Sequence, residues 1–338
     1  MKQFVRNSAV ALAFAAGSLA SAAVAQDRPW SPDEPLQIVV PWAAGGATDQ
    51  VTRITAGELE RVLGVSVVVV NQPGASGSIG KRGVLEGDKD GLTWAAGAPK
   101  QLGTYQLLDL LDTSLDDWHI YNTVVNVPVI SVNPDTPFET FPDLLAALKE
   151  RGSEISVGTA GATSSGHVAI EAIRSVEDFE YQHIPYDGGN PAVLSTVSGE
   201  TMVTTQLASE QAEMIRGKRL RPLAVVGDQP LEIDGYGTIP PITDWLDDIP
   251  VVSTHFGIFV PKGVPDEVVQ TFNDIWANEI AESEALQSYA RQAGALFDPS
   301  SGEEAIADVW PEVQADAWML HDAGRATMSP EDLDIPRP

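Results

Sequence analysis

The segment from residue 36 to residue 49 constrains the fold of this chain more than any other, because it joins an apolar run to a helix through two glycines. The run 36–40 is short, apolar and rich in β-branched residues, which predicts a buried strand. Gly45 and Gly46 follow, and Thr48 then stands where the first turn of a helix is expected. Such a turn presents backbone N–H groups to an anion, and glycine lets a ligand approach the main chain closely. The segment predicts an α/β protein with a candidate anion site, although many such turns bind nothing.

Strands and helices alternate along the rest of the chain, which predicts a mainly parallel sheet with helices on its faces. The expected strands are 36–40, 65–71, 155–159, 181–184, 202–205 and 221–226. The expected helices are 51–62, 141–149, one that begins near residue 167, 268–280 and 302–323. Gly64 is expected to stop the first of them, and Pro311 stands in the way of the last. The 338 residues leave room for two domains.

The acidic composition and the N-terminus indicate the compartment and exclude some partners. The formal net charge of −28 argues against nucleic acids and anionic membrane surfaces, which attract basic patches. Lys2 and Arg6 precede the apolar run 9–16, and an Ala-Val-Ala sequence ends at Ala25. This pattern predicts a signal peptide over residues 1–25, cleaved after Ala25, and a mature protein in the periplasm.

Three chemical alternatives fit the sequence poorly. The segment 75–82 resembles a phosphate-binding loop but lacks its first glycine and its final Ser or Thr. Ser164, Ser165 and His167 lie in one loop, but the G-x-S-x-G turn of a hydrolase is absent. His167 and Glu171 have the i, i+4 spacing of two metal ligands, and two ligands do not make a site. We therefore expect neither an enzyme nor a bound cofactor or metal.

Seven segments, taken in order, carry a family resemblance. They are residues 36–49, 67–80, 90–93, 158–167, 183–189, 220–225 and 257–265. Together they resemble the periplasmic substrate-binding proteins of tripartite tricarboxylate transporters, the Bug family. The resemblance implies an α/β fold of the two-lobed, type II periplasmic-binding-protein kind, in which each lobe is a mixed sheet flanked by helices and the ligand cleft lies between the lobes. Residues 26–127 and 253–338 would form lobe one and residues 128–252 lobe two, with crossings near 126–129 and 251–255.

The same resemblance implies a function. The protein would be an extracytoplasmic solute-binding protein, a monomer, that captures a small carboxylate, either a dicarboxylate or an aromatic one, for membrane permease subunits. A periplasmic carboxylate sensor that reports to a signalling protein is the alternative. The ligand-binding residues implied are Trp42, Ala44, Gly45, Gly46, Ala47, Thr48, Asp49, Ala98, Lys100, Gln101, Gly161, Ala162, Thr163, Ser164, Ser165, His167, Tyr186, Asp187 and Gly188.

Two hypotheses concern how an acidic protein would hold an acid. The helix starts after Gly46 and after Gly161 are expected to face the cleft, so that their free N–H groups and positive dipole ends meet at one carboxylate. Lys100 is the only basic residue of these loops. It is either a solvated lysine or the partner of a second carboxylate at the far end of the ligand. The segments 98–101, 187 and 202–206 depart from the family pattern, which leaves the ligand's identity open.

Overall fold

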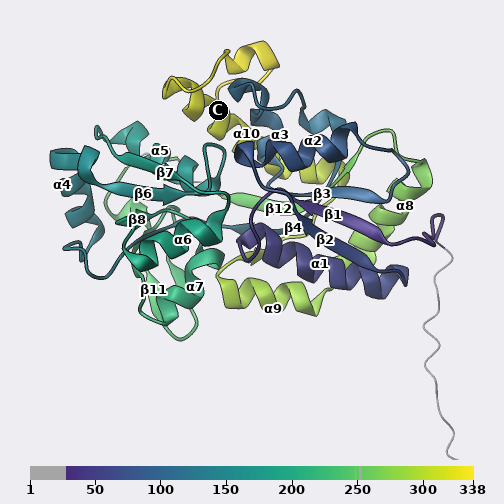
Figure 1. Ribbon diagram of the computed structural model, residues 1–338, viewed down its shortest axis with the longest axis horizontal. Helices are drawn as coiled ribbons and strands as arrows, with labels where there is room; N and C mark the ends of the chain where they lie inside the picture. Colours follow the sequence, from purple (N-terminus) through teal and green to yellow (C-terminus); the bar gives the residue numbers. More distant parts are fainter. Residues whose placement is uncertain (1–27, 248, 251–252) are drawn as a thin grey trace, which may run out of the picture.

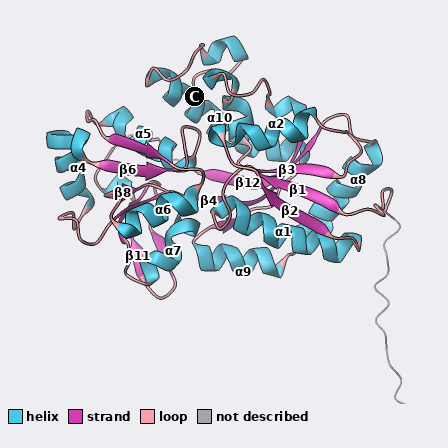
Figure 2. Cartoon of the chain, in the orientation of Figure 1, coloured by secondary structure: helices cyan, strands magenta, loops and turns pink. Residues whose placement is uncertain are grey.

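Two sheets flanked by helices form the molecule (Figures 1 and 2). The computed structural model describes residues 28–338 except 248, 251 and 252, so the signal peptide and part of the second crossing lie outside the described residues. In order, the first sheet contains β13 (Leu296–Phe297), β4 (Trp118–Asn126), β12 (Thr254–Pro261), β3 (Thr93–Gly97), β1 (Leu36–Val40) and β2 (Val67–Asn71). The second contains β7 (Gln182–Pro185), β6 (Ser156–Thr159), β8 (Val203–Thr204), β5 (Val129–Val132) and β9 (Arg221–Val225), and β10 (Leu231–Ile233) pairs with β11 (Gly237–Ile239).

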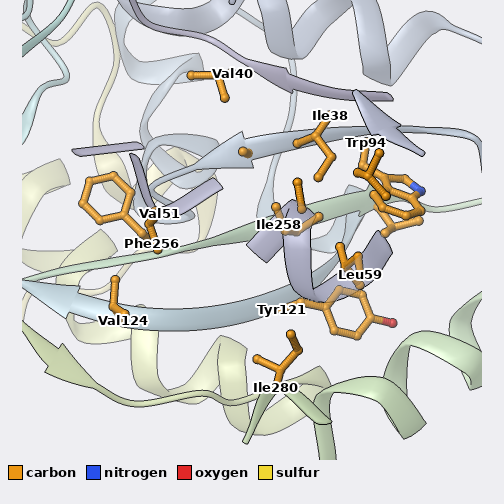
Figure 3. Packing of buried hydrophobic residues seen from close by; sticks show 14 of the residues in the cluster. Ile38, Val40, Val51, Leu59, Trp94, Tyr121, Val124, Phe256, Ile258 and Ile280 are labelled. Carbon is orange, nitrogen blue, oxygen red and sulfur yellow. The ribbon is translucent and has the colours of Figure 1, made fainter. Parts of the chain in front are cut away.

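Helices cover both faces of the first sheet, which explains why its strands are apolar on both sides. The α-helices in the described part of the chain are α1 (Ala47–Leu63), α2 (Ser78–Glu86), α3 (Lys100–Thr104), α4 (Phe141–Arg151), α5 (Ser165–Val176), α6 (Gly189–Ser198), α7 (Ala208–Arg216), α8 (Asp266–Ile275), α9 (Glu284–Ala293) and α10 (Gly302–Asp322). In β1, Ile38 and Val40 point into the core beneath α1, α8 and α9, whereas Val39 points into the core beneath α3 and α10. Figure 3 shows the first of these cores, a cluster that contains Ile38 and Val40 of β1 and Val51 and Leu59 of α1.

The helix α1 begins and ends where the sequence indicates. Gly46, whose backbone is extended, precedes Ala47. At the other end Gly64 has φ 73°, and its N–H donates to the carbonyl of Glu60 at 2.9 Å. This left-handed conformation favours glycine and satisfies a carbonyl that would otherwise lack a partner. The prediction that Gly64 stops this helix is confirmed.

The helix expected over residues 302–323 is confirmed as α10, which continues through Pro311. Pro311 lies on the exposed side of the helix, where water can reach the carbonyl that the missing N–H leaves unbonded. Val309 and Val313 pack in a core of lobe one, and Met319, further along the same helix, packs in the core of lobe two. Helix α10 therefore connects the two lobes through apolar contacts.

The sheets are mixed, which confirms the fold that the family resemblance implies, whereas the mainly parallel sheet expected from the alternation of strands and helices is wrong. β1 is parallel to β2 and β3, but β12 is antiparallel to both β3 and β4. β5 is antiparallel to β8 and β9. Asn126 at the end of β4 pairs with Thr254 at the start of β12, and Figure 1 shows both strands reaching towards the second sheet. We propose the lobe boundaries near these strand ends, at 127/128 and 252/253.

Candidate functional site

A small cavity lies between the lobes, where the turn before α1 faces the turn before α5. It is lined by Trp42, Gly46, Ala47, Thr48, Ala98, Gln101, Ala160, Ser164, Ser165, Gly189, Gln206, Leu207, Glu210 and Phe256. Its volume is about 30 Å³, enough for one or two water molecules. Pockets that hold small molecules usually measure roughly 300–1,000 Å³. A ligand of more than a few atoms therefore requires the lobes to move apart.

The turn before α1 is held by Asp49 in the first turn of that helix. Its carboxylate accepts the N–H of Gly45 at 2.9 Å and the amide of Asn71 at 2.9 Å, and it forms an ion pair with Arg53. Burial alone would raise the pKa of Asp49, but the hydrogen bonds from Arg53, Gly45 and Asn71 hold it below its usual value. Gly45 has φ +86°, a conformation that side chains disfavour. Asp49 thus shapes the turn and lies outside the lining of the cavity.

The start of α5 is built from two serines. The Ser164 hydroxyl accepts the N–H of His167 at 3.2 Å, as a helix N-cap does, and donates to the carbonyl of Gly161 at 2.8 Å. The Ser165 hydroxyl accepts a hydrogen bond from Thr254 at 2.8 Å. Both serines line the cavity, so this helix start presents hydroxyl groups and its positive dipole end to the space between the lobes.

Hydrogen bonds join the lobes around the cavity. The N–H of Ala43 donates to the carbonyl of Asp187 at 2.9 Å, and the N–H of Ala162 donates to the Ser76 hydroxyl at 3.2 Å. The Gln101 amide donates to the carbonyl of Thr163 at 3.1 Å. These bonds hold the cleft closed, and several residues of the implied ligand loops form them instead of lining the cavity.

Two lysines lie buried behind the site. Lys81 donates to the Gln101 side-chain oxygen at 2.6 Å and to the Tyr105 hydroxyl at 3.2 Å, and burial lowers the pKa of Lys81 well below its usual value. Lys81 therefore orients Gln101, which lines the cavity. Lys100 is also fully buried, but it pairs with Asp316 of α10 at 3.1 Å. Lys100 is thus not the solvated lysine that the sequence allowed, and its position does not support the hypothesis that it meets a ligand carboxylate.

Glu210 occupies the start of α1. Its Oε1 accepts the N–H of Ala47 at 3.0 Å, and its Oε2 accepts the N–H of Leu207 at 3.3 Å. Burial raises the pKa of Glu210 to about 7, against the effect of these two hydrogen bonds. The expectation that the Ala47 N–H is free for a ligand therefore needs correction, because a carboxylate of the protein itself already accepts it.

His167 is enclosed within lobe two. Its side chain is completely buried and its ring lies 4.3 Å from that of His183, between ring centroids. Burial lowers the pKa of both imidazoles, for His183 to about 4. His167 and Glu171 do share a helix face, with 4.0 Å between Nε2 and Oε1, but the residues that the structure describes contain no cluster of three or more potential metal ligands.

The structure thus divides the implied site residues. Those that line the cavity are Trp42, Gly46, Ala47, Thr48, Ala98, Gln101, Ser164 and Ser165. Those that lie outside its lining are Ala44, Gly45, Asp49, Lys100, Gly161, Ala162, Thr163, His167, Tyr186, Asp187 and Gly188. The lining residues that are not among the implied site residues are Ala160, Gly189, Gln206, Leu207, Glu210 and Phe256. Ala160 and Gly189 lie within the segments 158–167 and 183–189, and Gln206 ends the segment 202–206, whereas Glu210 offers only a helix-start signal, three residues after Leu207.

Comparison with known proteins identifies the family. A family model described as the tripartite tricarboxylate transporter family receptor matches residues 51–295. Protein BugT of Bordetella pertussis is 28% identical over 300 residues, which cover 87% of this chain and 90% of that protein. A UPF0065 protein of Cupriavidus necator is 25% identical over 86% of this chain and 88% of its own length.

Solved structures share the fold. The periplasmic binding protein BugD has a TM-score of 0.79 at 24% identity, over 87% of this chain and 99% of its own. An R. palustris protein with adipate has a TM-score of 0.77 at 24% identity, and the match covers 87% of this chain and 98% of that protein. MatC from Rhodopseudomonas palustris, with bound malate, has a TM-score of 0.73 at 19% identity, and the match covers 87% of this chain and 98% of MatC. These relatives are binding proteins and not enzymes, and this chain is a solute-binding protein that belongs to the tripartite tricarboxylate transporter family of receptors.

Proposed function

We propose that this protein captures a small carboxylate in the periplasm and delivers it to membrane permease subunits of a tripartite tricarboxylate-type transporter. The observation that carries the proposal is the cavity between the lobes, which the starts of α1 and α5 both line. Helix starts offer N–H groups and a positive dipole end to an anion. The adipate and malate of two structural neighbours support a carboxylate as the ligand.

The lining favours a ligand with an apolar or aromatic body. Trp42 and Phe256 are its largest apolar side chains, and the described residues that line it include no Lys or Arg. An acid would therefore be held by the start of α5 and by hydroxyl groups rather than by a cationic side chain. Donors on both lobes would contact the ligand, so binding would favour the closed form over the open one.

Export supports the same role. We propose that the mature protein begins at Gln26, after cleavage of the signal peptide, and acts as a periplasmic monomer. Between residues 28 and 338, no helix that the structure describes is long and apolar enough to cross a membrane. A sensor that reports to a signalling protein is the alternative, and adjacent genes for membrane subunits would favour transport over it.

A thermal-shift series with carboxylic acids and their methyl esters tests the proposal. The acids should stabilise the protein and the esters should not, because the ester lacks the charge that helix starts attract. Ser165→Ala should weaken binding about ten-fold or more, since a hydrogen bond to a charged group contributes roughly 1.5–3 kcal/mol. Ser198→Ala is the matched control, because Ser198 is exposed at the end of α6. Equal stabilisation by acid and ester would contradict carboxylate recognition, and native mass spectrometry of the purified protein would identify an acid that remains bound.

A further inference from the structure

Glu210 reaches from one lobe to the other. It belongs to α7 in lobe two, yet its Oε1 accepts the N–H of Ala47 at the start of α1 in lobe one. Its Oε2 remains on its own lobe, where it accepts the N–H of Leu207. With the Gln206 amide turned so that its oxygen accepts the N–H of Ala160, its nitrogen also donates to Glu210 Oε2 at 2.9 Å. A helix cap needs only Oε2, so the cross-lobe bond of Oε1 is additional.

Two glycines make room for this carboxylate. A Cβ atom on Gly189, the first residue of α6, would stand 1.8 Å from Glu210 Oε1, which is far inside contact distance. A Cβ atom on Gly46, just before α1, would stand 3.2 Å from the same oxygen. The carboxylate therefore fits beside two helix starts, α1 and α6, with room that a Cβ atom on Gly189 would remove and one on Gly46 would narrow. This is the kind of position in which a ligand carboxylate would otherwise be favoured.

The charge of Glu210 affects what can bind beside it. The other polar side chains that line the cavity, which are those of Thr48, Gln101, Ser164, Ser165 and Gln206, are neutral. A second negative charge next to Glu210 would face like-charge repulsion in a partly buried site, and it would find the Ala47 N–H already bonded. An ammonium or a hydroxyl there would instead find an acceptor. At the start of α5, the Ser164 hydroxyl already donates to Gly161, but the Ser165 hydroxyl accepts from Thr254 and can donate its own proton to the carboxylate of a ligand.

We propose that Glu210 is a specificity-determining residue, which reserves the start of α1 for its own carboxylate and so selects carboxylates with an ammonium or another hydrogen-bond donor at the far end over dicarboxylates. The inference rests on the proposed function, since it assigns the chemistry of the ligand's second group. It also gives the cleft a repulsive element against the competing ligand, which specificity often requires.

Isothermal titration calorimetry at pH 8 with two matched pairs of probes tests the inference. The pairs are succinate with 4-aminobutanoate and adipate with 6-aminohexanoate, in which an ammonium replaces one carboxylate at the same chain length. The wild type should bind the better amino acid at least about ten-fold more tightly than its diacid. Glu210→Gln should abolish or reverse that preference. Glu213→Gln, on the exposed side of the same helix and paired with Arg216, should keep it.

A second measurement uses the wild type alone, in case Glu210→Gln folds poorly. Because the pKa of Glu210 is raised to about 7, the preference should shrink at pH 6, where this carboxyl is largely protonated while both carboxyls of the diacids remain mostly ionised. The titratable group beside it is the phenol of Tyr289 on α9, whose pKa burial raises, so it stays neutral over this range.

The outcomes separate the two proposals. If diacids bind the wild type as tightly as the amino acids, or if the preference is the same in Glu210→Gln and at pH 6, the role of Glu210 is refuted and carboxylate binding stands. If no carboxylate binds or stabilises either protein, the proposed function is refuted, and the inference with it.

Discussion

Replacing Lys100 with methionine should destabilise the fold, because the variant leaves Asp316 buried without its partner. The ammonium and the carboxylate lie 3.1 Å apart, and their side chains are 1% and 6% exposed. Methionine keeps most of the aliphatic length of lysine and removes only the charge and its hydrogen bonds, including the bond to the carbonyl of Ser253. The variant therefore isolates the electrostatic contribution of the pair.

The expected loss is about 3–5 kcal/mol of unfolding free energy, the range for breaking a buried ion pair on one side. The double variant Lys100→Met, Asp316→Leu removes both charges, and its stability should return to within about 1 kcal/mol of the wild type or exceed it. Lys149→Met is the control, because Lys149 forms an ion pair with Glu177 at the surface, with its side chain 44% exposed. Exposed pairs contribute at most about 1 kcal/mol.

Urea denaturation followed by circular dichroism measures these differences, and pH adds a check on the cause. Burial already raises the pKa of Asp316 to about 6, against the lowering effect of Lys100. Without Lys100 that pKa should rise further, so the folded variant takes up a proton and its loss of stability should be smaller at pH 5.5 than at pH 8. A loss below about 1 kcal/mol at pH 8, or a double variant as unstable as the single one, would refute the reasoning. Selective weakening of diacid binding in Lys100→Met would restore the ligand-binding role.

Three further predictions follow from single residues. Burial raises the pKa of Glu210 from 4.5 to about 7, so the folded state binds this proton more tightly than the unfolded state does. As the pH rises from 4.5 to 7, the unfolding free energy of the wild type, measured by urea denaturation, should therefore fall by roughly 1–3 kcal/mol relative to that of Glu210→Gln. Gly257→Ala should lower the thermal unfolding temperature severely, because its Cβ atom would lie 2.1 Å from a backbone carbonyl oxygen of β4. Gly57→Ala, on the open face of α1, should instead stabilise the fold by about 0.5–1 kcal/mol. Burial disfavours the charged form of His255, but the hydrogen bond from its imidazole to Glu312 outweighs burial and raises the pKa of His255. An NMR titration should therefore give a pKa above 6.5 for His255, and Glu312→Gln should lower that pKa.

Local signals made the fold readable from the sequence. The strand β1, the turn before α1 and the end of that helix at Gly64 each depend on residues within a few positions of one another. Strand direction was harder, because the antiparallel pairing of β12 with β4 joins segments more than a hundred positions apart. The effect of Pro311 on α10 was hard to predict for another reason. The sequence shows that its N–H is missing, but it does not show that the ring lies on the exposed side of the helix.

The sequence did not predict which polar groups pair with one another around the candidate site. Lys100 stands in a loop that the family resemblance places at the ligand, but its partner Asp316 is 216 positions away. Glu210 reads as an ordinary residue of a helix start, and its contact with Ala47 spans 163 positions. Composition and spacing say which groups are charged, whereas the fold decides which of them face each other across a closed cleft.

The bond between Glu210 and Ala47 also bears on how a ligand closes the lobes. A ligand shifts the equilibrium between open and closed forms only by the difference in its affinity for the two. In the closed form a charged hydrogen bond at 3.0 Å already joins the lobes, together with the bond from Gln101 to Thr163. Closure is therefore stabilised in part by the protein itself, and a ligand that displaced Glu210 from Ala47 would have to replace that bond before it gained any affinity. A ligand that leaves Glu210 in place and adds contacts at the start of α5 avoids this loss, so the structure favours recognition at Ser164 and Ser165 over recognition at the start of α1.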